Sequence, residues 1–234
     1  MGINDLTLSG LAISSAIYNL TSFNDSLGNL KEETKNGIDL NNPDHRASMV
    51  TWLNKWGCRL SIKQHETTSI AIMDWYDQAG ADLFPITKAV WDLNDQDISG
   101  AANVYGSLKD KIAAQSTRNE KILDRHIGPT AASKILFAIR PEALMPWDEA
   151  MRKSFKCDGS PESYIKFLQE IRDIAWRIRD LCVANGFDIA ELPLQIERPD
   201  STVLEIINEY IWITVTSKCK PPSATILKRW AEWK

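Results

Sequence analysis

The chain has 234 residues and a mass of 26.4 kDa, and 44% of its residues are hydrophobic while 25% are charged. These values are typical of a globular protein and exclude disordered, collagen-like and low-complexity classes. The net charge of −4 excludes a protein that is basic overall, so any contact with nucleic acid has to come from a local basic surface.

The cysteines and the N-terminal segment indicate the class of protein. Cys58, Cys157, Cys182 and Cys219 form no C-x-x-C motif and have no closely spaced histidine partner, so we expect four free thiols, no metal site and no cofactor. The first twenty residues lack a basic segment and an unbroken apolar run, and no window approaches eighteen apolar residues. The sequence therefore predicts a reduced, cytoplasmic protein without a membrane span.

Apolar residues at steps of three and four predict helices along most of the chain. The first expected helix starts at Ile13 and ends at Gly28, and the second begins at Asn42-Pro43 and ends at Gly57. Further helices are expected, in chain order, over residues 69–78, 95–115, 130–139 and 161–184 and from residue 202 onward. The 95–115 helix is the weaker candidate because it contains two glycines.

The two C-terminal helices have the clearest start signals. Ser160 is the expected N-cap of the 161–184 helix, with Pro161 at the first helical position, and Thr202-x-x-Glu205 is a capping box. The β-branched run over 211–216 is compatible with a helix or a strand. With seven to nine helices and no series of alternating strands, we expect an all-α fold. We expect one compact multi-helix domain over residues 1–234. The sequence leaves open whether this domain is divided into two lobes.

The segment over residues 122–155 contains the candidate functional residues. It is expected to form a helix, a tight turn at His126-Ile127-Gly128-Pro129, a second helix, and then a loop leading to a further helix start. Gly128 supplies a positive φ or an unobstructed backbone, so that the first amides of the second helix point outward. Outward amides at a helix N-terminus bind anions, most often phosphate, and Lys134 would add positive charge one turn later.

The same segment resembles the helix-hairpin-helix DNA glycosylase superfamily. The family hairpin reads Gly-apolar-Gly, followed by an alanine and an apolar pair, and it aligns here with the residues from His126 to Leu136, with His126 in place of the first glycine. The family places a catalytic aspartate in a Pro-apolar-Asp-x-x-apolar-Arg context, which here is Pro146-Trp147-Asp148 and onward to Arg152, at a similar spacing from the hairpin.

The resemblance implies a helix-hairpin-helix at about residues 118–155 that binds duplex DNA. It implies that Asp148 is the catalytic residue and that His126, Gly128, Thr130, Lys134 and Arg152 contact the DNA. Thr130 stands where the bifunctional branch has its lysine nucleophile, so a monofunctional glycosylase is implied. The clustered cysteines of the iron–sulfur branch are absent, so no iron–sulfur cluster is expected.

A second resemblance covers about a third of the chain. The stretch Leu53-Asn54-Lys55-Trp56-Gly57-Cys58-Arg59 and the segment around Asp148 are similar to a group of uncharacterised bacterial, archaeal and phage proteins, and this resemblance implies no activity. Simpler interpretations remain open for individual residues. Asp148 could be only a helix N-cap, and Trp52, Trp56 and Trp147 could be core residues. The alternative function is a non-catalytic module that binds nucleic acid or a protein partner.

Charge is distributed unevenly along the chain. Between Arg118 and Lys156 there are eight basic and five acidic residues, so this segment carries +3 while the remainder carries −7. Such a difference is expected of a local DNA-binding face on an acidic protein.

Overall fold

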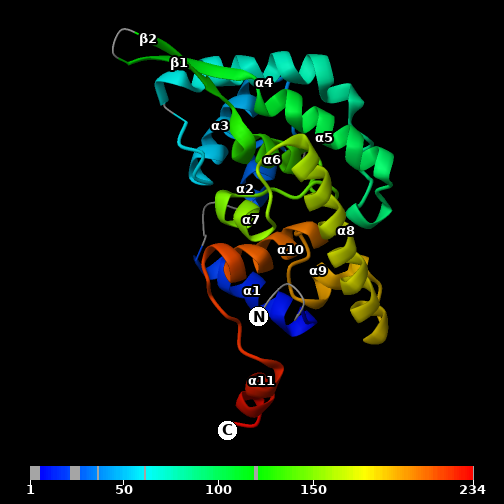
Figure 1. Cartoon of the computed structure of the whole chain (residues 1–234). Helices are drawn as coiled ribbons and strands as arrows, with labels where there is room; N and C mark the ends of the chain where they lie inside the picture. Colours follow the sequence, from blue (N-terminus) through cyan, green and yellow to red (C-terminus); the bar gives the residue numbers. More distant parts are fainter. Residues whose placement is uncertain (1–5, 22–26, 36, 61, 119–120, 234) are drawn as a thin grey trace.

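The structure is a computed structural model that describes residues 6–21, 27–35, 37–60, 62–118 and 121–233 (Figure 1). Within these residues the protein is predominantly helical, which confirms the all-α prediction apart from one β-hairpin. The helices are α1 (Leu8–Thr21), α2 (Leu27–Glu33), α3 (Pro43–Lys55), α4 (His65–Ala79), α5 (Asp95–Lys109), α6 (Gly128–Ile139), α7 (Glu149–Ser154), α8 (Pro161–Ala184), α9 (Leu192–Gln195), α10 (Val203–Ile211) and α11 (Ala224–Ala231). The two strands are β1 (Ile112–Arg118) and β2 (Lys121–His126).

Several helices begin where capping residues predict. The Asn42 side chain accepts a hydrogen bond from the Asp44 amide at 2.9 Å ahead of α3, and the Ser160 hydroxyl accepts one from the Ser163 amide at 3.1 Å ahead of α8. Thr202 forms the expected capping box of α10. These side chains satisfy first-turn amides that have no carbonyl partner, so they mark the helix starts.

Two expected helix ends are wrong. α1 ends at Thr21, and Gly28, where the first helix was expected to end, lies inside α2, while residues 22–26 fall outside the described part of the chain. α5 ends at Lys109, since β1 begins three residues later. The glycines inside α5 do not break it. A Cβ atom at Gly106 would lie 2.8 Å from the Pro161 ring, so glycine at this position allows the start of α8 to pack closely.

The segment ahead of α6 departs from the helix predicted there. Residues 121–126 form β2, which pairs antiparallel with β1, and the Gln115 side chain donates a hydrogen bond to Asp124 at 2.9 Å across the pair. The hairpin extends from the helical body (Figure 1). Ile122, which was expected to pack against α6, is 69% exposed. The predicted helix before Gly128 is therefore wrong, and these residues do not form the first helix of a helix-hairpin-helix motif.

The buried apolar side chains of α1 to α10 form one connected core. α6 lies at its centre and packs against α3 and α5. An aromatic group, in which the Tyr105 and Tyr164 rings stack at 4.3 Å and Trp147 is fully buried, fills the space between α5, α8 and the segment before α7. The prediction that Trp52 and Trp147 are core residues is confirmed, because both are almost completely buried.

α10 is anchored by an ion pair on one side. The Arg198 guanidinium contacts both carboxylate oxygens of Glu209, at 2.9 and 3.1 Å, and the Ser15 hydroxyl of α1 donates a hydrogen bond to the same carboxylate. After Ile211 the chain continues as one π-helical turn over Trp212–Thr216, so the open question of a strand in this run is answered in favour of a helix. None of the described helices combines the length and the apolar character needed to cross a membrane.

Candidate functional site

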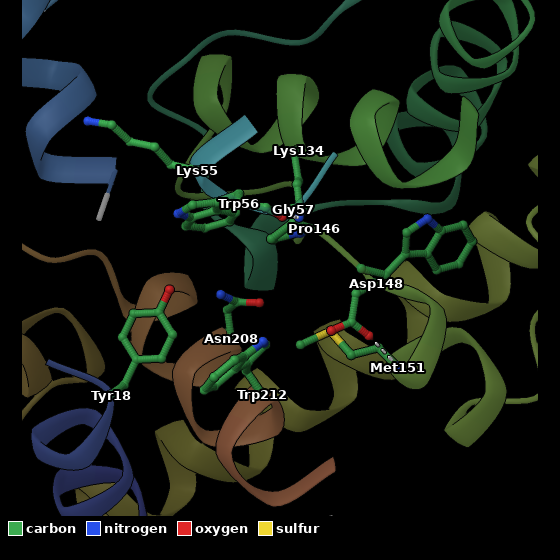
Figure 2. Close-up of a pocket in the computed structure, with 11 residues that line it drawn as sticks. Tyr18, Lys55, Trp56, Gly57, Lys134, Pro146, Asp148, Met151, Asn208 and Trp212 are labelled. Carbon is green, nitrogen blue, oxygen red and sulfur yellow. Dashed lines mark hydrogen bonds between the residues drawn. The ribbon is translucent and has the colours of Figure 1, made fainter. Parts of the chain in front are cut away.

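A cavity of about 260 Å³ opens between the end of α3, α6, the start of α7, α10 with its π-helical turn, and α1 (Figure 2). We call it the central pocket. The residues that line it are Tyr18, Lys55, Trp56, Gly57, Lys134, Pro146, Trp147, Asp148, Met151, Asn208 and Trp212. Four of these residues are aromatic, and the wall also carries a carboxylate, a carboxamide and two amines.

Asp148 both caps a helix and lines the central pocket. One carboxylate oxygen accepts a hydrogen bond from the Met151 amide at 2.7 Å, which makes Asp148 the N-cap of α7. The other accepts a hydrogen bond from the Thr216 hydroxyl at 2.8 Å. The sequence left open whether this carboxylate serves as a cap or faces a cavity. In the structure it caps α7 and also lines the central pocket.

Hydrogen bonds of the adjacent residue Trp147 fix the position of Asp148 relative to α6. The fully buried indole of Trp147 donates a hydrogen bond to the Pro129 carbonyl at 3.1 Å, and the Trp147 amide donates one to the Ser133 hydroxyl at 3.2 Å. Both partners lie in the first two turns of α6. The carboxylate is therefore tied to the helix that follows the Gly128 turn, although it lies twenty residues further along the chain.

Lys134 lies inside the protein rather than on its outer surface. It is 7% exposed, its ammonium donates a hydrogen bond to the Trp56 carbonyl, and the nitrogen lies 5.4 Å from the centre of the Trp56 ring. The ring adds a cation–π attraction to the hydrogen bond. This burial argues against the phosphate contact that we expected of Lys134 from the sequence, and it places the amine on the wall of the central pocket.

The Leu53–Arg59 stretch forms the turn that presents Trp56. Gly57 has a φ of +79°, a conformation that favours glycine, and the chain reverses there after α3. The Asn54 carboxamide fastens the turn, because it accepts a hydrogen bond from the Leu60 amide at 2.6 Å and donates one to the Leu60 carbonyl at 2.8 Å. The Trp56 ring is half-buried and forms part of the pocket wall, so the core interpretation applies to it only in part.

The Gly128 turn forms a second, outer hollow of about 380 Å³. Gly128 has the expected positive φ, +79°, and the first turn of α6 faces this hollow together with Arg59 and Glu149. Thr130 also lines it, and its hydroxyl accepts a hydrogen bond from the Arg152 guanidinium at 2.9 Å. Thr130 and Arg152, which were both expected to contact DNA, are thus brought together, and they bind each other.

His126 lies in a third hollow beside the outer one. Its ring is exposed, and Nδ1 lies 2.7 Å from the Asp110 carbonyl oxygen. Arg59 and Arg125 line the same hollow. The predicted residues therefore fall into two groups: Asp148 and Lys134 in the central pocket, and the turn residues on the adjoining surface.

Sequence reasoning missed three residues of the central pocket. Tyr18 comes from α1, and Asn208 and Trp212 come from α10 and its π-helical turn, far from the Asp148 segment in the chain. The Tyr18 and Trp212 rings meet edge to face at 5.4 Å. No local pattern distinguished them from core residues, because only the packing of α1 and α10 brings them to the pocket.

The four cysteines are free thiols, as expected. Burial raises the pKa of the Cys58 thiol, which borders the outer hollow, so this cysteine is not an activated nucleophile. Within the described residues, histidine, cysteine and acidic side chains form no group of three or more that could hold a metal ion. Comparisons of the chain with protein families, with curated proteins and with solved structures found no match.

Proposed function

We propose that the chain binds duplex DNA and holds one extruded base in the central pocket, as a monofunctional base-excision DNA glycosylase. The observation that carries this proposal is the position of Asp148, a carboxylate on the wall of a tryptophan-lined cavity next to a turn with outward backbone amides. Enzymes that act on a base in DNA extrude it into such a pocket, where aromatic side chains stack on it.

The size and the lining of the pocket favour a single base. Pockets for drug-sized ligands span roughly 300–1,000 Å³, and the central pocket, at about 260 Å³, lies just below that range. Trp56 and Trp212 offer rings for stacking, which is typically worth about 1–3 kcal/mol per base.

The surface around the Gly128 turn would hold the DNA backbone. Arg59, Arg125 and His126 are exposed there, and the first amides of α6 are free to face a phosphate. Glu149 opposes this charge at one edge of the outer hollow. The distant resemblance to helix-hairpin-helix glycosylases supports the proposal over the turn, α6 and Asp148, with a β-hairpin in place of the preceding helix.

In the proposed reaction the bond between the base and C1′ of the sugar breaks and the base leaves with the bonding electrons. Asp148 would stabilise the positive charge that develops on the sugar, and a water molecule would add its oxygen to C1′ while its proton passes to the departing base. Thr130 has no amine, so the product would be an abasic site in an intact strand.

One observation favours a non-catalytic alternative. Both carboxylate oxygens of Asp148 already accept hydrogen bonds, from Met151 and Thr216. A residue that serves only to cap α7 and to tie it to the π-helical turn would make these same two bonds. In that case the chain would bind DNA without breaking a bond.

The substitution Asp148→Asn tests the two roles. Asn caps helices about as well as Asp but carries no charge, so a catalytic Asp148 predicts a variant that folds and binds DNA yet releases no base. The assay is base release from duplexes with deaminated, alkylated, oxidised or mismatched bases, followed by alkali to reveal abasic sites. Asp173→Asn is the matched control, because Asp173 is an exposed carboxylate on α8, outside the central pocket and the outer hollow.

The outcomes separate the proposals. Wild-type protein that binds duplex DNA but releases no base from any substrate supports the non-catalytic alternative. Strand cleavage without alkali would contradict the monofunctional reaction and would direct attention to the amine of Lys134 in the pocket. Absence of DNA binding at low salt would overturn both.

A further inference from the structure

Asn208 has an unusual environment for a buried polar residue. It lies in the middle of α10, where every residue is buried, and it is itself only 6% exposed. Among the described residues its carboxamide makes no hydrogen bond and faces the central pocket (Figure 2). Figure 2 shows the group directed into the cavity between Tyr18, Trp56 and Trp212.

Stability does not explain an asparagine at this position. The Asn208 carboxamide makes no hydrogen bond to the described residues, so it does not help to hold α10 in place, and the neighbouring residues of α10 show that apolar side chains pack well there. Elsewhere in the same fold a half-buried asparagine has its carboxamide fully paired, since Asn54 both donates to and accepts from Leu60. The unused donor and acceptor of Asn208 therefore indicate a partner that enters the pocket.

We infer that Asn208 is the specificity-determining residue of the central pocket and that it pairs with the edge of a nucleobase that presents a hydrogen-bond donor next to an acceptor. This inference rests on the proposed function, since it assigns the recognition step of the same pocket. A carboxamide offers one acceptor and two donors in one plane, and it forms two parallel hydrogen bonds with such an edge.

The other groups in the pocket fit the same ligand. The planar rings of Trp56 and Trp212 favour a planar heterocycle. Lys134 is engaged by the Trp56 carbonyl. The Trp56 indole N–H also has no partner, but its nitrogen is buried. Asn208 is thus the carboxamide on the wall whose hydrogen bonds a lactam or amidine edge, as in uracil, adenine or cytosine, would complete.

The test compares ligands and variants in pairs. Uracil and 1,3-dimethyluracil have the same ring, but the methyl groups remove the N–H donor from the second. Asn208→Leu removes donor and acceptor at similar size, and Asn208→Asp replaces the donor with an acceptor. Asn103→Leu is the matched control, because Asn103 is an exposed asparagine within α5. Binding of each free base is followed by tryptophan fluorescence, and thermal unfolding checks that each variant is folded.

We expect the wild type and Asn103→Leu to bind uracil more tightly than dimethyluracil. Asn208→Leu should lose about tenfold in uracil affinity, since two net hydrogen bonds are worth about 1–3 kcal/mol, and should bind dimethyluracil unchanged. Asn208→Asp should also bind uracil more weakly, because its carboxylate repels the uracil carbonyl oxygens. Equal effects of Asn208→Leu on both ligands, or none on uracil, would overturn the inference.

Affinity for a mismatched duplex, measured in parallel by fluorescence anisotropy, separates the inference from the proposed function. If a folded Asn208→Leu variant binds both the duplex and uracil as the wild type does, the inference about Asn208 is overturned and the proposed function is not. Base binding that depends on Asn208 in a protein that binds no DNA overturns the proposed function and supports the assignment of Asn208.

Discussion

The Thr216 hydroxyl donates a hydrogen bond to Asp148 across 68 residues of sequence, at 2.8 Å. It joins the start of α7 to the π-helical turn that follows α10, and the two elements pack against each other. The carboxylate is thereby held from both sides, by its own helix and by the opposite wall of the central pocket.

Replacing Thr216 should affect the position of Asp148 more than the stability of the fold. Thr216→Val removes the hydroxyl at nearly constant volume, and we expect the free energy of unfolding to fall by about 1 kcal/mol. Base release should slow while DNA affinity stays unchanged, because the carboxylate loses one of its two restraints. Thr216→Ser restores the hydroxyl and should restore the rate. A Ser variant as slow as Val would contradict a role for this hydrogen bond.

The ion pair of Arg198 and Glu209 predicts a pH-dependent stability defect. Burial raises the pKa of Glu209, and the Arg198 guanidinium opposes that rise. In Arg198→Met the buried carboxylate loses its partner, and we expect the free energy of unfolding at neutral pH to fall by about 3 kcal/mol. Urea denaturation of both proteins measures this difference.

The sign of the pH effect follows from the direction of the pKa shift. Without Arg198 the pKa of Glu209 in the folded state rises further above the unfolded value, so the folded state binds more protons than the unfolded state. The defect should therefore be smallest at mildly acidic pH and grow as the pH rises through the folded pKa. Adding Glu209→Gln to Arg198→Met should abolish this pH dependence. A defect that is constant with pH would show that Glu209 is not its cause.

Two glycine substitutions should change stability in opposite directions. Gly128→Ala meets no steric clash, but an L-residue at a φ of +79° is strained, and we expect a loss of about 1 kcal/mol. Gly100→Ala lies in the interior of α5, also without a clash, and should gain about 0.5–1 kcal/mol. Urea denaturation of both variants provides the comparison. Stabilisation by Gly128→Ala would contradict the positive φ of this turn.

The salt dependence of DNA binding should separate Arg59 from Lys134. Arg59 is exposed beside the Gly128 turn, whereas Lys134 is buried against Trp56. Arg59→Gln should lower the slope of log affinity against log salt by about one, and Lys134→Met should leave the slope unchanged. Arg177→Gln, on the exposed face of α8, is the control. A reduced slope of log affinity against log salt for Lys134→Met would show that the Lys134 ammonium contacts a phosphate in the complex.

Capped helices were predictable because a cap is a local chemical signal. Asn42, Ser160 and Thr202 each satisfy an amide within three residues of themselves, so their identity alone marks a helix start. The hairpin gave no such signal. Ile122 and Leu123 are exposed, so no alternation of buried and exposed residues was present to indicate a strand, and a short apolar run is equally compatible with a helix.

The candidate site was predictable where it is built from one continuous segment. Asp148 follows from its motif, whereas the burial of Lys134 does not, since a lysine on a helix is usually exposed. The role of Asn208 could not be predicted from the sequence. The pattern of α10 shows that its residues are buried, but it contains nothing that indicates which buried side chain borders a cavity rather than the core.

α10 carries two neighbouring residues into different environments, Asn208 into the central pocket and Glu209 into the ion pair with Arg198. Because the ion pair fixes the rotation of the helix about its own axis, the carboxamide of Asn208 and the ring of Trp212 are oriented before any ligand arrives. A preorganised wall loses little conformational entropy on binding. The affinity of the pocket for the proposed base should therefore depend on the shape of the base and on its hydrogen bonds to Asn208 rather than on the cost of ordering the protein.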